Sequence, residues 1–188
     1  MALPHNQLAV TPNAASTARV GLDRRKRIVG IADLAVSSDP QEIITTYALG
    51  SCLGIAVYDP EARVAGLLHF MLPNAAMAPD RAASNPLMFA DTGLTQLFRE
   101  CYNLGAKKER MLVSGAGGAS FVAQESDLAI GQRNVAMLRK VLWTNGVMLR
   151  KHDFGGLEAR TMSIDVGTGA VTLNVAGTAR ILYEGSAR

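Results

Sequence analysis

The strongest constraint on the fold is a pair of apolar runs separated by a short turn sequence. The runs are residues 53–58 and 64–70, and Asp59-Pro60-Glu61 lies between them. Two runs of strand length around an Asp-Pro turn predict an antiparallel hairpin. In such a hairpin the start of the first strand lies beside the end of the second. We therefore expect residues that flank these two ends to meet.

The rest of the chain alternates between strand and helix patterns. Apolar residues at helical spacing predict two main helices, at residues 94–104 and 131–143. Short strands are expected near residues 28–31, 43–49 and 111–113, with three more between 147 and 183, and residues 73–86 are expected to form a long surface loop. The pattern predicts an α/β protein of the α+β type. It is a single domain of largely antiparallel β-sheets packed with two main helices in a layered sandwich.

Composition favours one domain preceded by a tail. The chain has 188 residues, 48% of them hydrophobic, which is enough to bury a core without a metal or a disulfide. Residues 1–25 are rich in small and polar side chains and predict a flexible N-terminal tail, so the domain covers residues 26–188. No signal-peptide pattern or run of bilayer-spanning length is present, so we expect a cytoplasmic protein without direct membrane insertion.

Several common functions find no support in the sequence. The net charge is only +3, and the one basic run, residues 24–27, lacks the aromatic platform of a nucleic-acid site. Two cysteines and three scattered histidines form no metal-ligand cluster, so no metal or other cofactor is expected. The glycine-rich segment 115–120 lacks the third glycine of a dinucleotide fingerprint. We interpret it as a turn or a loop that lines a site.

The two cysteines lie in different settings. Cys101 falls on the apolar stripe of the first helix, where a thiol acts as a small hydrophobe. Cys52 follows Gly50 and Ser51 at the break between two predicted strands. The small residues leave room for a tight turn and for a substrate. Cys52 is therefore the candidate nucleophile, with Gly50 and Ser51 as candidates for lining the site and holding an oxyanion.

A nucleophilic thiol needs a neighbouring base, because only a few per cent of a free thiol is ionised at neutral pH. His5 lies in the predicted tail and His152 is interpreted as a surface group, whereas His69 lies inside an apolar run. The hairpin brings Cys52 and His69 to the same end. Spacing alone leaves open a core histidine bonded to backbone, because a buried polar group must be paired in either case.

A third group should orient the imidazole. Thr46, on the strand that leads into the Cys52 turn, has a hydroxyl suited to this role. A threonine in a strand is more often present for its β propensity. The other candidates are Thr45, Ser51, Asp59 and Asp153.

Three motifs together resemble the CheD family of chemoreceptor glutamine deamidases. They are Thr46-x-x-Leu49-Gly50-Ser51-Cys52, Tyr58-Asp59-Pro60 and His69-Phe70-Met71-Leu72-Pro73. Gly131-Gln132-Arg133-Asn134 and Asp153-x-Gly155-Gly156 followed by Arg160 are also similar to that family. The resemblance covers roughly residues 27–175, and it implies that Cys52, His69 and Thr46 are catalytic.

The resemblance also implies an activity and partners. The activity is hydrolysis of glutamine side chains to glutamate through a thioester on Cys52, with release of ammonia. The substrate implied is the cytoplasmic domain of a chemoreceptor (a methyl-accepting chemotaxis protein), and the regulatory partner implied is the CheC phosphatase. Two alternatives remain open: a non-catalytic adaptor that binds CheC or receptors, and a transglutaminase in which an amine replaces water.

Overall fold

The expected hairpin forms the centre of one of two β-sheets. β4 (Leu53–Asp59) pairs with β5 (Val64–Phe70), from Leu53 opposite Phe70 to Asp59 opposite Val64. The computed structural model describes residues 24–120 and 130–185. In it this sheet, called sheet II below, has the order β2-β5-β4-β6-β7. Its other strands are β2 (Asp33–Ser37), β6 (Leu112–Gly117) and β7 (Leu149–Phe154).

The second sheet, called sheet I, has the order β1-β3-β8-β9-β10. Its strands are β1 (Arg25–Val29), β3 (Glu42–Leu49), β8 (Arg160–Asp165), β9 (Val171–Val175) and β10 (Thr178–Tyr183). β1 pairs with β3 in parallel, as β6 does with β7, and the other strand pairs among the described residues are antiparallel. The sheets are therefore largely antiparallel, as expected.

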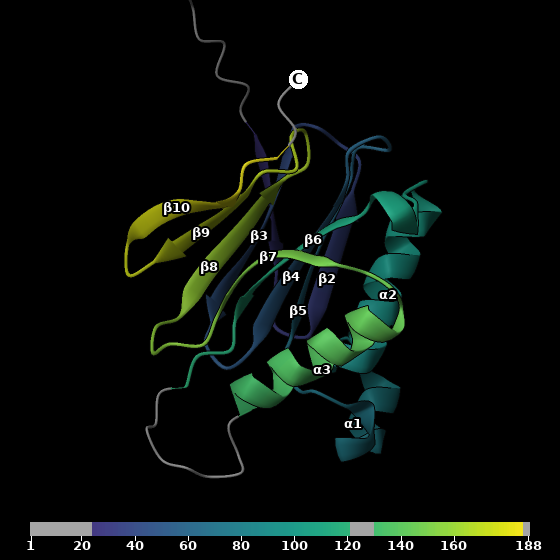
Figure 1. Ribbon diagram of the computed structural model, residues 1–188, viewed down its shortest axis with the longest axis vertical. Helices are drawn as coiled ribbons and strands as arrows, with labels where there is room; N and C mark the ends of the chain where they lie inside the picture. Colours follow the sequence, from purple (N-terminus) through teal and green to yellow (C-terminus); the bar gives the residue numbers. More distant parts are fainter. Residues whose placement is uncertain (1–23, 121–129, 186–188) are drawn as a thin grey trace, which may run out of the picture.

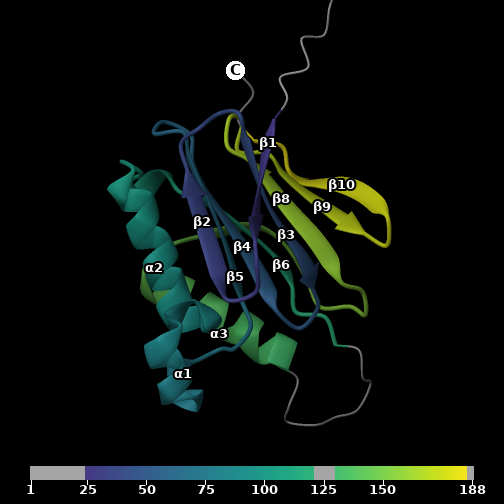
Figure 2. The ribbon, with the colours of Figure 1, turned by 180° about the vertical axis from the view of Figure 1, so that it is seen from behind.

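Helices cover the outer face of sheet II. The two long ones are α2 (Ala90–Asn103) and α3 (Ile130–Thr144). The shorter helical segments are α1 (Pro79–Ser84), η1 (Ala75–Met77), η2 (Pro86–Met88) and η3 (Lys108–Arg110). Figures 1 and 2 show the resulting order of layers, with sheet I on one side of sheet II and the helices on the other.

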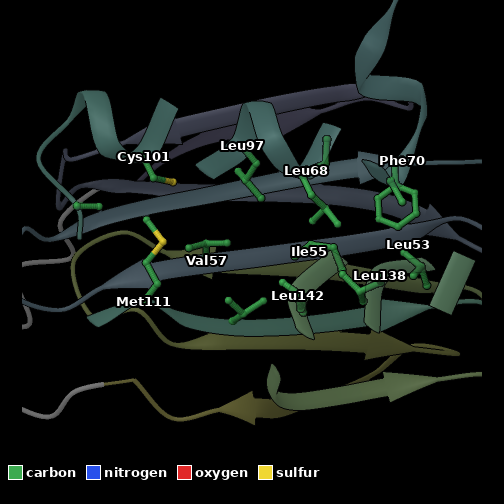
Figure 3. Packing of buried hydrophobic residues seen from close by; sticks show 14 of the residues in the cluster. Leu53, Ile55, Val57, Leu68, Phe70, Leu97, Cys101, Met111, Leu138 and Leu142 are labelled. Carbon is green, nitrogen blue, oxygen red and sulfur yellow. The ribbon is translucent and has the colours of Figure 1, made fainter. Parts of the chain in front are cut away.

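The alternation of strand residues builds two apolar cores. Leu53, Ile55 and Val57 of β4 point toward the helices and pack with Leu138 of α3, in the cluster that Figure 3 shows. The intervening residue Ala56 belongs to the second cluster, which fills the space between the two sheets. Full burial of a side chain such as leucine stabilises the fold by about 1.5–3 kcal/mol. The central strands β4 and β5 of sheet II are thus buried on both faces, and a polar side chain on them requires a partner.

The layered sandwich predicted from the sequence is confirmed, with local differences. The expected loop at 73–86 contains α1 and η1, because Asn74 caps η1 and Pro79 starts α1. The strand β2 was not expected, and the C-terminal region has four strands where three were expected. The strand near 111–113 extends to Gly117. Residues 1–23 of the predicted tail, which was expected to cover residues 1–25, lie outside the described residues, and β1 begins at Arg25, the last residue of that predicted tail. No helix in the described ranges is long and apolar enough to cross a membrane.

Candidate active site

Thr46 and His69 meet across the space between the two sheets. Thr46 lies on β3 of sheet I and His69 on β5 of sheet II, and both side chains are buried. The Thr46 Oγ1 atom lies 2.8 Å from His69 Nδ1. The candidate base therefore has a polar partner within an otherwise apolar interface, as a buried imidazole requires.

The hydrogen bonds of Thr46 determine the tautomer of His69. The Thr46 hydroxyl donates its hydrogen to the carbonyl oxygen of Val29, 2.9 Å away. A hydroxyl has one hydrogen, so Thr46 Oγ1 must accept the bond from His69 Nδ1–H. The neutral ring then carries its lone pair on Nε2. That atom is buried and has no hydrogen-bond partner among the described residues. His69 thus presents an unoccupied proton acceptor.

Cys52 lies one residue before β4, close in register to His69. Gly54 is directly opposite His69, and Leu53 is opposite Phe70. Gly54 has no side chain, and a Cβ atom there would lie 2.7 Å from Cδ1 of Leu49. Glycine at this position leaves room for the Leu49 side chain in the core between the two sheets. Cys52 is half-buried and is a free thiol.

The glycine-rich segment 115–120, which was interpreted as a turn or loop, belongs to β6 up to Gly117, and its last residues hold the Cys52 loop in place. Gly118 N–H donates to the Cys52 carbonyl at 2.9 Å, and Ala119 N–H donates to the Gly50 carbonyl at 2.8 Å. Gly117 has φ of 115°, and a Cβ atom at this position would lie 2.2 Å from the Cys52 carbonyl oxygen. Glycine is therefore required for this approach. The segment therefore supports the loop that carries the candidate nucleophile.

Asn134 connects the two ends of the hairpin. Its side chain is fully buried in the first turns of α3, and its Nδ2 donates to the Ser51 carbonyl at 3.0 Å and to the Met71 carbonyl at 2.9 Å. Ser51 precedes Cys52, and Met71 follows His69 by two residues. Sequence reasoning placed Asn134 at a helix start and gave it no role. The one available signal was its place in the motif 131–134.

Burial favours the neutral forms of both candidate catalytic groups. Burial lowers the pKa of His69 from 6.5 to about 4. Burial raises the pKa of the Cys52 thiol, and its own backbone N–H opposes this to a smaller degree. Near neutral pH, burial therefore favours a neutral thiol at Cys52 and a neutral imidazole at His69 over a thiolate and an imidazolium.

The other candidate orienting groups lie elsewhere. Thr45 is bonded to Ser163 at 2.9 Å within sheet I, and Asp59 binds Arg110 at the far end of β4. Asp153 pairs with Arg160 and Arg180. Ser51 lies in the Cys52 loop, where its carbonyl accepts a hydrogen bond from Asn134. Among the candidate third groups, Thr46 is the one with a hydrogen bond to His69.

The remaining thiol and imidazole fit the roles expected of them. Cys101 is buried in the core on α2, and burial raises its pKa to about 12. His152 is exposed and stacks on Phe154 with ring centroids 4.9 Å apart. No group of three or more metal-ligating side chains occurs within residues 24–120 and 130–185. His5 lies outside the described residues.

Comparison with known proteins gives a consistent result. The family model "CheD chemotactic sensory transduction" matches residues 71–175. This segment includes Asn134 and begins just after His69.

The chain aligns with nearly the whole length of several named relatives. A probable chemoreceptor glutamine deamidase CheD 1 from Syntrophus aciditrophicus is 45% identical over 150 residues, which are 80% of this chain and 94% of the relative. A probable chemoreceptor glutamine deamidase CheD from Solibacter usitatus is 42% identical over 150 residues, covering 80% and 89%. The one from Pyrococcus abyssi is 42% identical over 147 residues, covering 77% and 88%.

Proposed function

The chain belongs to the CheD family, and we propose that it is a protein-glutamine glutaminase that converts glutamine side chains of chemoreceptors to glutamate. The relatives carry the name chemoreceptor glutamine deamidase, which supplies the reaction and the substrate. The observation that carries the assignment to particular residues is the buried Thr46–His69 contact beside the Cys52 loop. We assign Cys52 as nucleophile, His69 as base and Thr46 as the group that orients His69.

The strand register supports a position of Cys52 near His69, although no hydrogen bond joins the Cys52 sulfur to His69 Nε2 in the structure. Gly54 faces His69, so Cys52 occupies the diagonal position on the neighbouring strand. The alternation of β4, continued by one residue beyond its start, assigns Cys52 to the face of Gly54 and His69. Diagonal neighbours of an antiparallel pair lie about 7–8 Å apart, a separation that an aromatic side chain such as histidine can span. His69 Nε2 is the acceptor available on that face.

The first half-reaction forms a thioester. The Cys52 thiol transfers its proton to His69 Nε2 as the sulfur attacks the carbon of the glutamine side-chain amide. The electron pair of the amide C=O moves to oxygen, where backbone N–H groups at Ser51 and Cys52 stabilise the oxyanion. When the C=O bond re-forms, the C–N bond breaks. The nitrogen takes the proton from His69 and leaves as ammonia.

The second half-reaction uses water. His69 Nε2, again neutral, accepts a proton as the water oxygen attacks the thioester carbon. Collapse of the tetrahedral intermediate breaks the C–S bond, and Cys52 recovers its proton from His69. The net change replaces the amide nitrogen by a water oxygen, giving glutamate and ammonia. No step in this sequence requires a redox change.

The cellular setting follows from the substrate. Receptor glutamines modified by such an enzyme lie in the cytoplasmic domain, so we place the protein in the cytoplasm. The family resemblance implies a CheC-type phosphatase as regulatory partner. Co-purification of the two proteins, and the effect of the phosphatase on ammonia release, test this part of the proposal.

The activity is tested by mass spectrometry of a purified receptor cytoplasmic fragment. The fragment is incubated with the wild type, with Cys52→Ala and without enzyme, and its peptides are then mapped. Conversion of particular glutamines to glutamate by the wild type alone supports the proposal. Binding without conversion would favour the adaptor, and incorporation of a labelled primary amine in preference to water would indicate a transglutaminase.

A further inference from the structure

Asn134 holds the peptide group that precedes the candidate nucleophile. The Ser51 carbonyl and the Cys52 N–H belong to one planar trans peptide, so they point in opposite directions. Asn134 Nδ2 binds the Ser51 carbonyl at 3.0 Å from the side of α3. The Cys52 N–H is thereby turned away from α3. Asn134 thus determines where this N–H group points.

The other peptide of Cys52 is fixed as well. Its carbonyl accepts the 2.9 Å bond from Gly118 N–H. Both peptide groups that flank the Cys52 Cα are therefore held by carbonyl contacts, whereas the Cys52 N–H has no backbone acceptor among the described residues. This N–H belongs to the same residue as the attacking sulfur and therefore lies close to it. When the sulfur attacks an amide carbon, the oxyanion develops close to the sulfur, so a donor at this position can stabilise it.

The fold explains how a helix side chain reaches this loop. Gly131 lies in the first turn of α3, and a Cβ atom on it would approach the Gly118 carbonyl oxygen to 2.5 Å. The absence of that side chain lets α3 pack directly on the segment that holds Cys52. Asn134, one turn later, is then placed between the Ser51 and Met71 carbonyls.

The orientation of the Asn134 amide is also determined. Its two contacts are carbonyl oxygens, which only the NH₂ group can satisfy. The Oδ1 atom is buried and has no partner among the described residues. A buried acceptor without a partner is destabilising. The two donor bonds of Asn134 offset this cost, because they satisfy the Ser51 and Met71 carbonyl oxygens.

We propose that Asn134 is a positioning residue that orients the Ser51–Cys52 peptide, and thereby aims the Cys52 N–H at the oxygen that becomes negative during the reaction. The bond to the Ser51 carbonyl also polarises the same peptide and makes its N–H a stronger donor. This inference rests on the proposed function and adds a residue to it. The link to Met71 keeps this peptide in register with the strand that carries His69.

The test compares deamidation with a reaction of the same thiol that develops no oxyanion. Alkylation of Cys52 by iodoacetamide depends on the thiol and its base, whereas deamidation also depends on the oxyanion donor. For Asn134→Ala we expect kcat on the receptor fragment to fall by about 10²-fold, as when one oxyanion donor is lost. KM should stay within about twofold, since the donor acts in the transition state. The alkylation rate should fall by no more than about threefold.

Matched variants separate positioning from folding. Asn134→Asp keeps the shape of the side chain and removes both donors, so it should lose kcat in the same way. Asp59→Asn disturbs a buried polar group at the far end of β4. It should lower the thermal unfolding temperature without changing kcat. All variants are assayed below the onset of unfolding, which circular dichroism defines.

Three results would overturn the inference. They are full activity of Asn134→Ala, a parallel loss of alkylation and deamidation, and a similar kcat loss in Asp59→Asn. No turnover by the wild type would overturn the proposed function and this inference with it. Full activity of Asn134→Ala with an active wild type would overturn the inference alone.

Discussion

Gly54 lies directly opposite His69 in the pair of β4 and β5, and this register brings the imidazole to the end of the hairpin where Cys52 begins its turn. Glycine at this position accommodates the side chain of Leu49 from the facing sheet, so the two sheets can pack closely next to His69. The site thus depends on packing between the sheets as much as on the residues that carry the chemistry.

Replacement of Gly54 by alanine tests this packing. The added Cβ atom would lie 2.7 Å from Leu49 Cδ1 and 3.2 Å from Met162 Sδ, in the core between the sheets. We expect Gly54→Ala to lower the free energy of unfolding by about 1–3 kcal/mol. Gly30→Ala is the control, because nothing lies within 4 Å of a Cβ atom there. Equal stability of the two variants in denaturant unfolding would contradict the expected crowding.

Loss of the Thr46 hydroxyl tests the orientation of the base. Thr46→Val keeps the shape of the side chain and leaves His69 Nδ1 without its 2.8 Å partner. We expect kcat to fall by about 10–100-fold, since the orientation and tautomer of the base are no longer fixed. Thr46→Ser should recover most of the activity. Thr45→Val, which removes a hydroxyl bonded to Ser163, should leave kcat near the wild-type value.

The pH dependence of activity should reflect a base that stays neutral in mild acid. Burial lowers the pKa of His69 to about 4, and burial raises the pKa of Cys52. We therefore expect kcat/KM on the receptor fragment to stay nearly constant as the pH falls through 6.5 and to decline as it approaches 4. An acid limb centred near the ordinary histidine value would show that His69 is not the buried base described above.

The same group should make stability depend on pH. Between the unfolded pKa of 6.5 and the folded pKa of about 4, the unfolded state binds more protons, so stability decreases as the pH falls through this range. Because His69 is buried, the decrease attributable to it should reach about 3 kcal/mol. Urea unfolding at several pH values measures this. A His69→Gln variant should show a flatter profile, and an unchanged profile would exclude His69 as the cause.

The sequence was informative where local pattern determines structure. The apolar runs around Asp59-Pro60 predicted the hairpin, and the hairpin brought Cys52 and His69 to one end. The helical stripe likewise assigned Cys101 to the core, where it is buried. These conclusions depend on residue spacing within single elements, which strand and helix geometry determine.

Contacts between the layers could not be predicted from residue spacing. The Thr46–His69 bond joins two sheets, and spacing alone could not select Thr46 over Thr45; the family resemblance did. Asn134 received no role because its contact with Ser51 depends on the approach of α3 to Gly118. The short strand β2 was missed because its polar ends hide the apolar alternation, although it pairs fully with β5.

If Cys52 carries the acyl group of the substrate during turnover, that group can be trapped on its sulfur. Wild-type protein and a Cys101→Ala control are mixed with the receptor fragment, quenched in acid during turnover and digested. Mass spectrometry then locates any peptide joined to a cysteine. If Cys52 is the nucleophile, we expect a hydroxylamine-sensitive thioester on the Cys52 peptide in both proteins. The Cys52→Ala variant should form neither the adduct nor glutamate. Glutamate formation by Cys52→Ala, or an adduct on another residue, would contradict this role of Cys52.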